Sequence, residues 1–291
     1  MNSIQASLPK GLDIAPGQKS PLVLTFSEPN GKILTTEGAG QGKVMWSDLK
    51  LSATVVAVNN KGVVSLPHDP RVSDGKIPHV TVTVPSHPDL RADLDIPIRY
   101  DEKYVANFSG SRGSDGMSGS DGSDGTSGIA GSMDPNNPSA GGDGGNGGDG
   151  SNGQDGSNGG DAPPVQVRMT VRADAHPLLQ VSVSADGHQK FYLIDPQGGS
   201  LTVKANGGEG GSGGRGGRGG SGGSGGIGSP NGSDGRSGSD GRNGGDGSHG
   251  RGGLVTVTYD PQAKAYLNTL HLSSQYGPAP VFREETVAAL W

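Results

Sequence analysis

Glycine returns at every third position through four long runs of this sequence, and few backbone conformations suit such a repeat. The runs cover 110–131, 141–161, 207–228 and 232–253, and together they hold 44 of the 56 glycines. Each run is 21 or 22 residues long and keeps its period of three throughout. Flexible Gly/Ser linkers are the alternative, but a linker needs neither a strict triplet phase nor matched lengths. We therefore expect four ordered rods of equal height.

The extended left-handed helix of the polyproline II type has three residues per turn, a rise of about 3.1 Å per residue and no internal hydrogen bonds. At that rise a run of this length spans about 68 Å. Every N–H and C=O points outward and needs a partner. Collagen supplies partners from two further chains, but its repeats are rich in proline and these runs contain none. We expect antiparallel polyglycine II helices, packed side by side and bonded backbone to backbone.

The glycine phase predicts which rod is most enclosed. Run 207–228 reads GGX throughout and offers two faces that a neighbouring backbone can approach. Runs 110–131 and 232–253 offer mostly one such face, so we place them at the edge with Ser, Asp and Arg turned to water. The short turn 229–231 predicts that the third and fourth rods are antiparallel. If all four rods rise from one β base, the loops 132–140 and 229–231 meet at the far tip.

In this layout the chain resembles the tail-fibre tip adhesins of certain tailed phages and the glycine-rich bacterial surface proteins described as collagen-like, which contain polyglycine II bundles. The resemblance covers 110 to about 273, through the GGX and GXD triplets and the strands beside them. In the phage adhesins, loops at the bundle tip recognise the receptor. The resemblance implies that 132–140 and 229–231 make contacts here; the alternative is that both are plain turns. The tip residues that could contact a sugar or a further subunit are Asp134, Asn136, Asn137 and Asn231.

Residues 1–108 are expected to form an all-β domain, an immunoglobulin-type β-sandwich. Trp46 is expected in its core, and a platform for a ligand is the alternative. Its predicted strands are short β-rich runs between turn residues; they cover 21–26, 49–58, 63–66, 80–84 and 96–100.

Residues 109–273 are expected to hold the rods and a β base made from 164–205 and 254–272. The strands predicted for this base cover 165–171, 179–184, 190–194, 200–205, 254–259 and 265–272.

The remaining residues, 274–291, are expected to form a C-terminal tail. Within this tail, one or two amphipathic helical turns are expected over 284–291, after the Pro-rich stretch 277–280. Exposed apolar residues here would favour a partner contact, and a simple tuck onto the base is the alternative. The candidate partner contacts in the tail are Phe282, Leu290 and Trp291.

Composition narrows the function classes. The formal net charge is −6, so nothing points to nucleic acid. There is no cysteine, hence no disulfide framework. No basic-then-apolar leader and no long apolar stretch is visible at the start or elsewhere. We expect an extracellular, cell-surface or virion location.

The sequence offers no catalytic, cofactor or metal constellation. The G-x-S-x-G match at 210–214 follows from composition alone. A calcium-binding β-roll needs large apolar residues that run 141–161 lacks. The aspartates of run 141–161 recur every six residues, which is two turns of a rod with three residues per turn, so they share one face. This spacing predicts a solvated acidic stripe or ion pairs with the arginines of the other rods. These residues are Asp143, Asp149, Asp155 and Asp161, and the arginines are Arg215, Arg218, Arg236 and Arg242.

These observations favour a non-enzymatic structural or adhesive protein, a subunit of an extracellular fibre or a fibre-tip adhesin. We expect a homo-oligomer or filament with a possible cell-surface receptor or glycan, and no cofactor. The alternative is an ice-binding protein, because some arthropod antifreeze proteins are polyglycine II bundles. Outward Asp and Arg side chains argue against the flat face of small residues that such proteins use.

Overall fold

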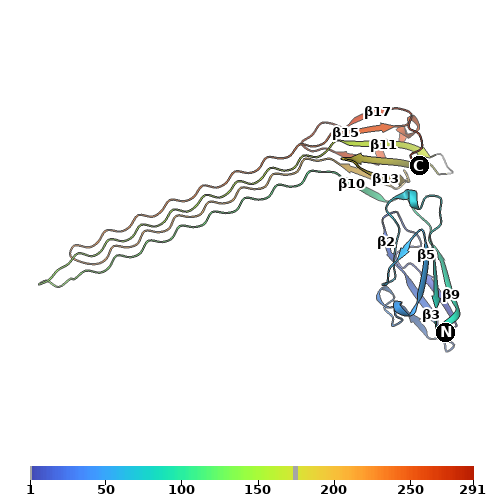
Figure 1. Cartoon of the computed structure of the whole chain (residues 1–291), viewed down its shortest axis with the longest axis horizontal. Helices are drawn as coiled ribbons and strands as arrows, with labels where there is room; N and C mark the ends of the chain where they lie inside the picture. The colour runs from blue at the N-terminus through green and yellow to red at the C-terminus, as the bar shows by residue number, and fades with distance from the viewer. Residues whose placement is uncertain (1, 173–175) are drawn as a thin grey trace.

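The structure is a computed structural model that describes residues 2–172 and 176–291. It is mostly β, with five small sheets and four short 3₁₀ helices in the described residues. Figure 1 shows an N-terminal group of sheets, a second group that carries the C-terminus, and four long extended segments that leave the second group together and end at a distant tip. We call the second group of sheets the base.

The N-terminal part is built from three sheets of three strands each. Along a strand such as β8, side chains alternate between the apolar core and the surface. In β8, Val80, Val82 and Val84 are buried while the residues between them are partly exposed. They meet Phe26 and Trp46 in one apolar core, which confirms the prediction for Trp46. The sheets are β1 (Ser3–Ser7)–β3 (Val23–Ser27)–β4 (Ile33–Thr35), β2 (Lys19–Pro21)–β7 (Val63–Ser65)–β6 (Ala57–Val58) and β5 (Lys50–Thr54)–β8 (His79–Val84)–β9 (His87–Asp95). The 3₁₀ helices are η1 (Gly38–Gly40), η2 (Trp46–Asp48) and η3 (Pro70–Val72).

The all-β class of this part is confirmed, but several details differ from the prediction. An immunoglobulin-type sandwich has two sheets, whereas these strands divide among three. The strand expected over 49–58 is broken at Val55, whose φ of 69° no strand accommodates. The strand expected over 96–100 is reduced to a single bridge between Ile98 and Ile14. Strand β9 was not predicted, because Pro88 and its alternating charges are unusual in a strand.

The base contains two sheets that face each other across one apolar core. Strands β11 and β15 are parallel, as are β10, β14 and β16. Large buried residues from both sheets, such as Met169, Tyr192 and Leu201, fill the core. The sheets are β13 (His188–Ile194)–β12 (Leu178–Ala185)–β11 (Val165–Arg172)–β15 (Val255–Tyr259)–β17 (Val281–Glu284) and β10 (Lys103–Asn107)–β14 (Ser200–Lys204)–β16 (Leu270–Ser273).

The predicted base strands agree with β11 to β15 to within a residue or two at each end. The turn of the β12–β13 hairpin lies at Asp186 and Gly187, both at positive φ, as a two-residue hairpin turn requires. Strand β10 falls inside the range expected for the N-terminal domain, yet it pairs with β14, and its Tyr104 and Ala106 lie in the core of the base. The chain therefore enters the base earlier than expected.

The strand predicted over 265–272 is only partly correct. Residues Pro261–Thr269 form the 3₁₀ helix η4, and strand β16 begins at Leu270. The reason is local: the Asp260 side chain accepts a hydrogen bond from the N–H of Gln262, and Pro261 occupies the first helical position.

The helical turns predicted over 284–291 are not formed. The tail instead continues as β17, which pairs parallel to β15, and then as an irregular stretch that crosses to the far strands of the sheet. Val287 is buried, and its N–H donates to the Asp260 carboxylate.

Candidate functional site

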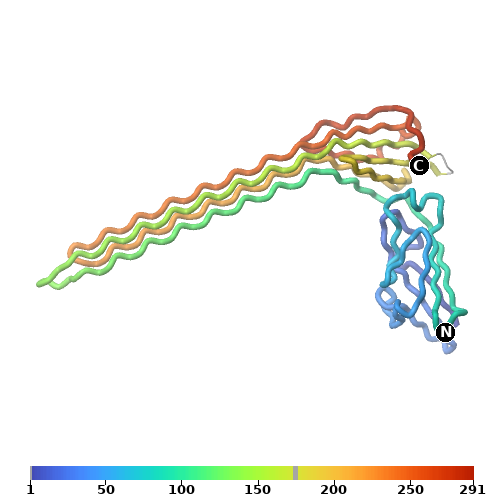
Figure 2. Tube along the Cα trace, viewed as in Figure 1, coloured from blue at the N-terminus to red at the C-terminus, as the bar shows by residue number. Residues whose placement is uncertain are grey.

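The four glycine segments (110–131, 141–161, 207–228 and 232–253) lie side by side and are hydrogen-bonded along their whole length. Their backbone N–H groups donate to a neighbouring segment at every third residue, with N···O distances of 2.7 to 3.0 Å. The first and third segments are parallel, as are the second and fourth, and the other bonded pairs are antiparallel. The up-and-down course and the antiparallel third and fourth segments agree with the prediction, and Figure 2 traces this course.

The third segment is the most enclosed, as its GGX sequence predicted. Its glycines are buried at every third position from Gly208 to Gly226, whereas no residue of the first or second segment is buried. The second and third segments each bond to all three others, and in the described residues no bond joins the first to the fourth. A Cβ at Gly217 would lie 2.0 Å from the carbonyl oxygen of Ser120 in the first segment. A Cβ at Gly216 would lie 2.1 Å from the carbonyl oxygen of Gly241 in the fourth. Both glycines of each triplet are therefore required by close backbone approach.

Side chains of the second segment complete the hydrogen bonding of the fourth. At every third position an Asp or Asn accepts a bond from a backbone N–H of the fourth segment, at 2.7 to 2.8 Å. We call this row the Asx ladder; it consists of Asp143, Asn146, Asp149, Asn152, Asp155, Asn158 and Asp161. No ion pair joins its aspartates to the arginines named above in the described part of the chain. The acidic stripe is exposed as predicted, but it caps backbone groups, which the sequence analysis missed.

Two further rows act in the same way on the third segment. Side chains of the fourth segment accept from the first glycine of the third-segment triplets from Gly210 to Gly225, as Asp240 does from Gly219 at 2.8 Å, and Asn231 of the turn caps Gly228. In the first segment Asp121 accepts from Arg218 at 2.7 Å. The full set of such acceptors is Asp115, Asp121, Asp124, Asn231, Asp234, Ser237, Asp240, Asn243, Asp246 and His249.

The base sets the register of the whole bundle. In β10–β14, partners are 97 positions apart, and the same offset joins Asp121 to Arg218 in the first and third segments. In β11–β15, partners are 90 positions apart, and the same offset joins Asp149 to Ser239 in the second and fourth. Each parallel pair of strands therefore continues into a parallel pair of glycine segments without a slip.

At the far tip the two connecting loops bond to each other. The N–H of Ser229 donates to the carbonyl of Ser139 at 2.9 Å. The Asp134 carboxylate accepts from the N–H of Asn136, and the Asn231 side chain accepts from the N–H of Gly228. Of the four tip residues singled out from the sequence, Asp134 and Asn231 therefore also hold the turns. The tip loop residues Asp134, Asn136, Asn137 and Asn231 are all exposed.

The tip also carries apolar side chains that the sequence analysis did not single out. Ile129 is 83% exposed, Met133 66% and Ile227 64%. Elsewhere in the segments the outward positions are small, polar or charged, apart from Met117. Leu254, which directly follows the fourth segment at the base, is also exposed. Isolated exposed apolar residues are ordinary, but a group at one end of a polar bundle points to a contact surface.

The candidate contacts of the tail divide into two kinds. Phe282, on the edge strand β17, is 50% exposed. Leu290 and Trp291 instead hold the tail onto the base: the N–H of Leu290 donates to the Gln180 side chain, and the Gln180 amide donates to the carbonyl of Trp291. The Trp291 ring meets Phe191 edge-on, with ring centroids 5.8 Å apart.

Trp291 also reaches the N-terminal part. Its indole N–H donates to the Asp74 carboxylate at 2.9 Å, and the Arg172 guanidinium binds the same carboxylate at 2.6 Å. The guanidinium of Arg71 lies 3.7 Å above the ring of Phe191. One aspartate thus joins the N-terminal part, strand β11 and the tail.

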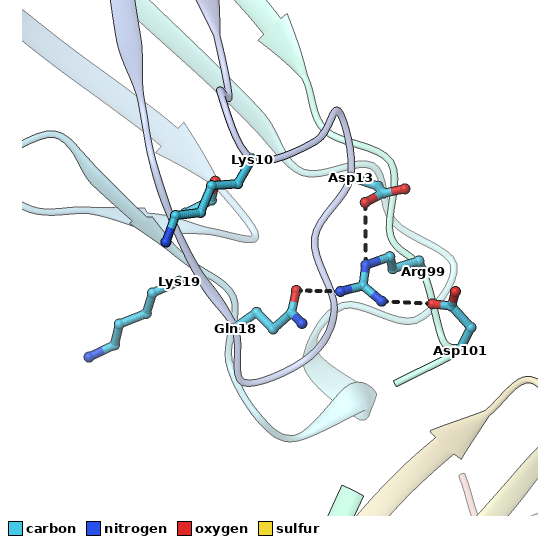
Figure 3. A pocket seen from close by; sticks show the side chains of 7 residues that line it. Lys10, Asp13, Gln18, Lys19, Arg99 and Asp101 are labelled. Atoms are coloured by element: carbon cyan, nitrogen blue, oxygen red, sulfur yellow. Dashed lines mark hydrogen bonds and ion pairs between the residues drawn. The ribbon is translucent and has the colours of Figure 1, made fainter. Parts of the chain in front are cut away.

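A polar hollow lies in the N-terminal part and is drawn in Figure 3. Its volume is about 510 Å³. Arg99 points into it and binds Asp13, Asp101 and Gln18, and the bond to Asp101 raises the pKa of Arg99. Its positive charge is therefore already paired. The lining residues are Lys10, Asp13, Gln18, Lys19, Ser20, Arg99 and Asp101.

In the described residues, no group of three or more His, Cys, Asp or Glu side chains could hold a metal ion. No helix among them is long and apolar enough to cross a membrane. Comparisons of the chain with protein-family models, with curated proteins and with solved structures gave no match.

Proposed function

We propose that the four glycine segments are left-handed polyglycine II helices and that the protein is a non-enzymatic structural or adhesive protein. In this proposal it is a subunit of an extracellular fibre or a fibre-tip adhesin, similar to the phage and bacterial glycine-rich proteins described above. The observation that carries the proposal is the hydrogen-bond network with its period of three residues. That period is the number of residues per turn of a polyproline II-type helix, which must find its hydrogen bonds in neighbouring chains.

The bundle suits a spacer because its backbone is cross-linked from base to tip. The parallel strands of the base fix the register, and close glycine contacts leave the third segment no room to shift. Loops on such a stiff support are well placed for binding. The N-terminal part, for which an immunoglobulin-type sandwich was expected, would serve as the anchor or spacer at the other end.

One observation keeps ice binding as a second candidate. The outward Asp and Arg side chains that argue against a flat face of small residues are missing where the first segment meets the second, because neither row of residues there carries a charge. Ser157 and Ser151 instead bond to backbone N–H groups of Ser114 and Ser120 at 2.6 and 2.7 Å. The rows are Ser111, Ser114, Met117, Ser120, Ser123, Thr126 and Ile129 in the first segment, and Gly142, Gly145, Gly148, Ser151, Gln154, Ser157 and Gly160 in the second.

Electron microscopy and circular dichroism of the purified protein test the proposal together. A fibre subunit should form filaments or particles with rod-like projections, and a polyproline II signal should be lost cooperatively on heating. Non-cooperative loss of that signal, with flexible-chain NMR shifts over 207–228, would contradict the helical bundle. Thermal hysteresis of the freezing point without any assembly would favour ice binding instead.

A further inference from the structure

The hollow drawn in Figure 3 has the size of a small-molecule site and is lined only by polar residues. Its volume of about 510 Å³ lies within the roughly 300–1,000 Å³ that is common for such sites. Every side chain that lines it is charged or carries a hydroxyl or an amide group. A parallel bridge between Ile14 and Ile98 joins the two chain segments that supply Asp13 and Arg99 to it. The hollow is therefore fixed by the fold and favours a polar ligand.

One side of the hollow offers positive charge that has no partner. Lys10 and Lys19 both line the hollow, and both are exposed. In the part of the chain that the structure describes, neither ammonium group makes an ion pair or a hydrogen bond. Ser20 follows Lys19 in strand β2 and lines the same hollow; it is 6% exposed, and its hydroxyl has no hydrogen-bond partner. Because buried hydroxyls in folded proteins normally have a partner, we expect an acceptor from outside the chain at this side.

The other side of the hollow offers carboxylates. Three of them bind the Arg99 guanidinium at N···O distances of 3.3, 2.8 and 3.1 Å, and they belong to Asp13, Asp101 and Glu102. One positive and three negative charges leave this group with a net charge of −2, which is opposite to that of the two lysines. In Figure 3 the side chain of Gln18 lies between the lysines and this group. Since carboxylate oxygens accept several hydrogen bonds each, the complementary ligand is negative at one end and rich in hydroxyl donors at the other.

We propose that this hollow binds one acidic sugar residue of a surface glycan. The sugar carboxylate accepts hydrogen bonds from Lys10, Lys19 and the Ser20 hydroxyl, and charge makes these bonds stronger than neutral ones. The ring hydroxyls of the sugar donate to Asp13 and Asp101. The inference rests on the proposed adhesive function; it names the class of ligand and places it on the N-terminal part, at the opposite end of the molecule from the tip.

Other ligands complement the two sides less well. A simple inorganic anion brings negative charge to the lysines but no set of hydroxyl donors to the carboxylates. A neutral sugar leaves both ammonium groups without an anionic acceptor. A peptide brings apolar side chains, for which the lining of this hollow offers no apolar residue.

Isothermal titration calorimetry of the full chain with sodium glucuronate tests the site, and glucose is the neutral control ligand. Glucuronate should bind about tenfold more tightly than glucose or better, because charge-assisted hydrogen bonds are roughly twice as strong as neutral ones. The double variant Lys10→Gln and Lys19→Gln should weaken glucuronate binding by about tenfold or more for the same reason. The matched control is Lys43→Gln with Lys50→Gln, which removes the same charge from exposed lysines of the N-terminal part that do not line the hollow. It should bind glucuronate as the unchanged chain does.

Ser20→Ala separates binding from folding. The Ser20 hydroxyl has no partner in the structure, so its removal should not lower the free energy of unfolding. The same variant should weaken glucuronate binding by about threefold or more, because the carboxylate loses a donor. Glucuronate binding that is unchanged in Ser20→Ala and in the double lysine variant would overturn the inference.

The remaining outcomes distinguish this inference from the proposed function. Equal affinities for glucose and glucuronate, or sodium sulfate that binds as tightly as glucuronate, would each overturn a site for an acidic sugar. Filaments of a chain that binds no glucuronate would overturn the inference while the fibre function stands. Glucuronate binding by a chain that forms neither filaments nor particles with rod-like projections would support the sugar site and contradict the fibre.

Discussion

Replacing Gly217 by alanine should destabilise the bundle far more than an alanine placed at a glycine with free space. The added Cβ would lie 2.0 Å from the carbonyl oxygen of Ser120, whereas ordinary van der Waals contact begins at 3.4 Å. The first segment must therefore move away from the third by about 1.4 Å. Neither atom is the end of a flexible side chain, so the strain falls on the backbone.

Such a movement breaks the bonds that flank the contact. Gly119 and Gly122 donate to the third segment at 2.7 and 2.8 Å, and Asp121 accepts from the N–H of Arg218 at 2.7 Å. Three hydrogen bonds at a net ~1 kcal/mol each give a loss of about 3 kcal/mol in the free energy of unfolding.

Gly245→Ala is the matched control, because a Cβ there meets only an Asp155 oxygen at 3.6 Å. With room available and no positive φ, alanine should stabilise the chain by roughly 0.4–1 kcal/mol by restricting the unfolded state. Urea unfolding followed by circular dichroism measures both variants. Equal free energies of unfolding for the two variants, or changes of the same sign, would refute the packing argument.

Three further predictions concern the ladder, the tyrosines and the domain contact. Asn152→Ala leaves the N–H of Arg242 without its acceptor, so it should lower the free energy of unfolding by roughly 0.5–1.5 kcal/mol. Asn152→Asp keeps an acceptor and should leave that free energy unchanged; equal losses in the two variants would contradict a capping role. Burial raises the pKa of Tyr192 and of Tyr100 to about 12. Because tyrosines of the unfolded chain ionise first, near pH ~10, the free energy of unfolding should fall as the pH rises from about 10 towards 12. Urea unfolding at several pH values measures this, and a free energy that stays constant over that range would contradict it. Asp74→Ala removes the carboxylate that Arg172 and Trp291 both bind, so the free energy of unfolding should fall by about 1.5–3 kcal/mol. Trp291 fluorescence should shift towards that of a solvated indole, and an unchanged spectrum would mean that the tail is held without this bond.

The glycine phase by itself determined the most distinctive part of this molecule. A side chain is tolerated only where the neighbouring backbone is far enough away to leave room for a Cβ. The GGX triplets therefore predicted an enclosed third segment with two closely approached faces. The short turn at 229–231 predicted that the third and fourth segments run in opposite directions. The base strands β11 to β15 followed from local apolar patterns and turn residues.

Other features depended on partners distant in sequence, and only the tertiary structure decided them. Nothing local distinguishes an aspartate that faces water from one that caps a backbone N–H 90 positions away, so the role of the Asx ladder was missed. Strand β10 joined the base because β14 offered it an edge, and Trp291 turned inward because Asp74 and Phe191 lie beneath it. A residue's own neighbours set its propensity, but the burial and hydrogen bonding of these side chains are set by segments that the chain brings together only on folding.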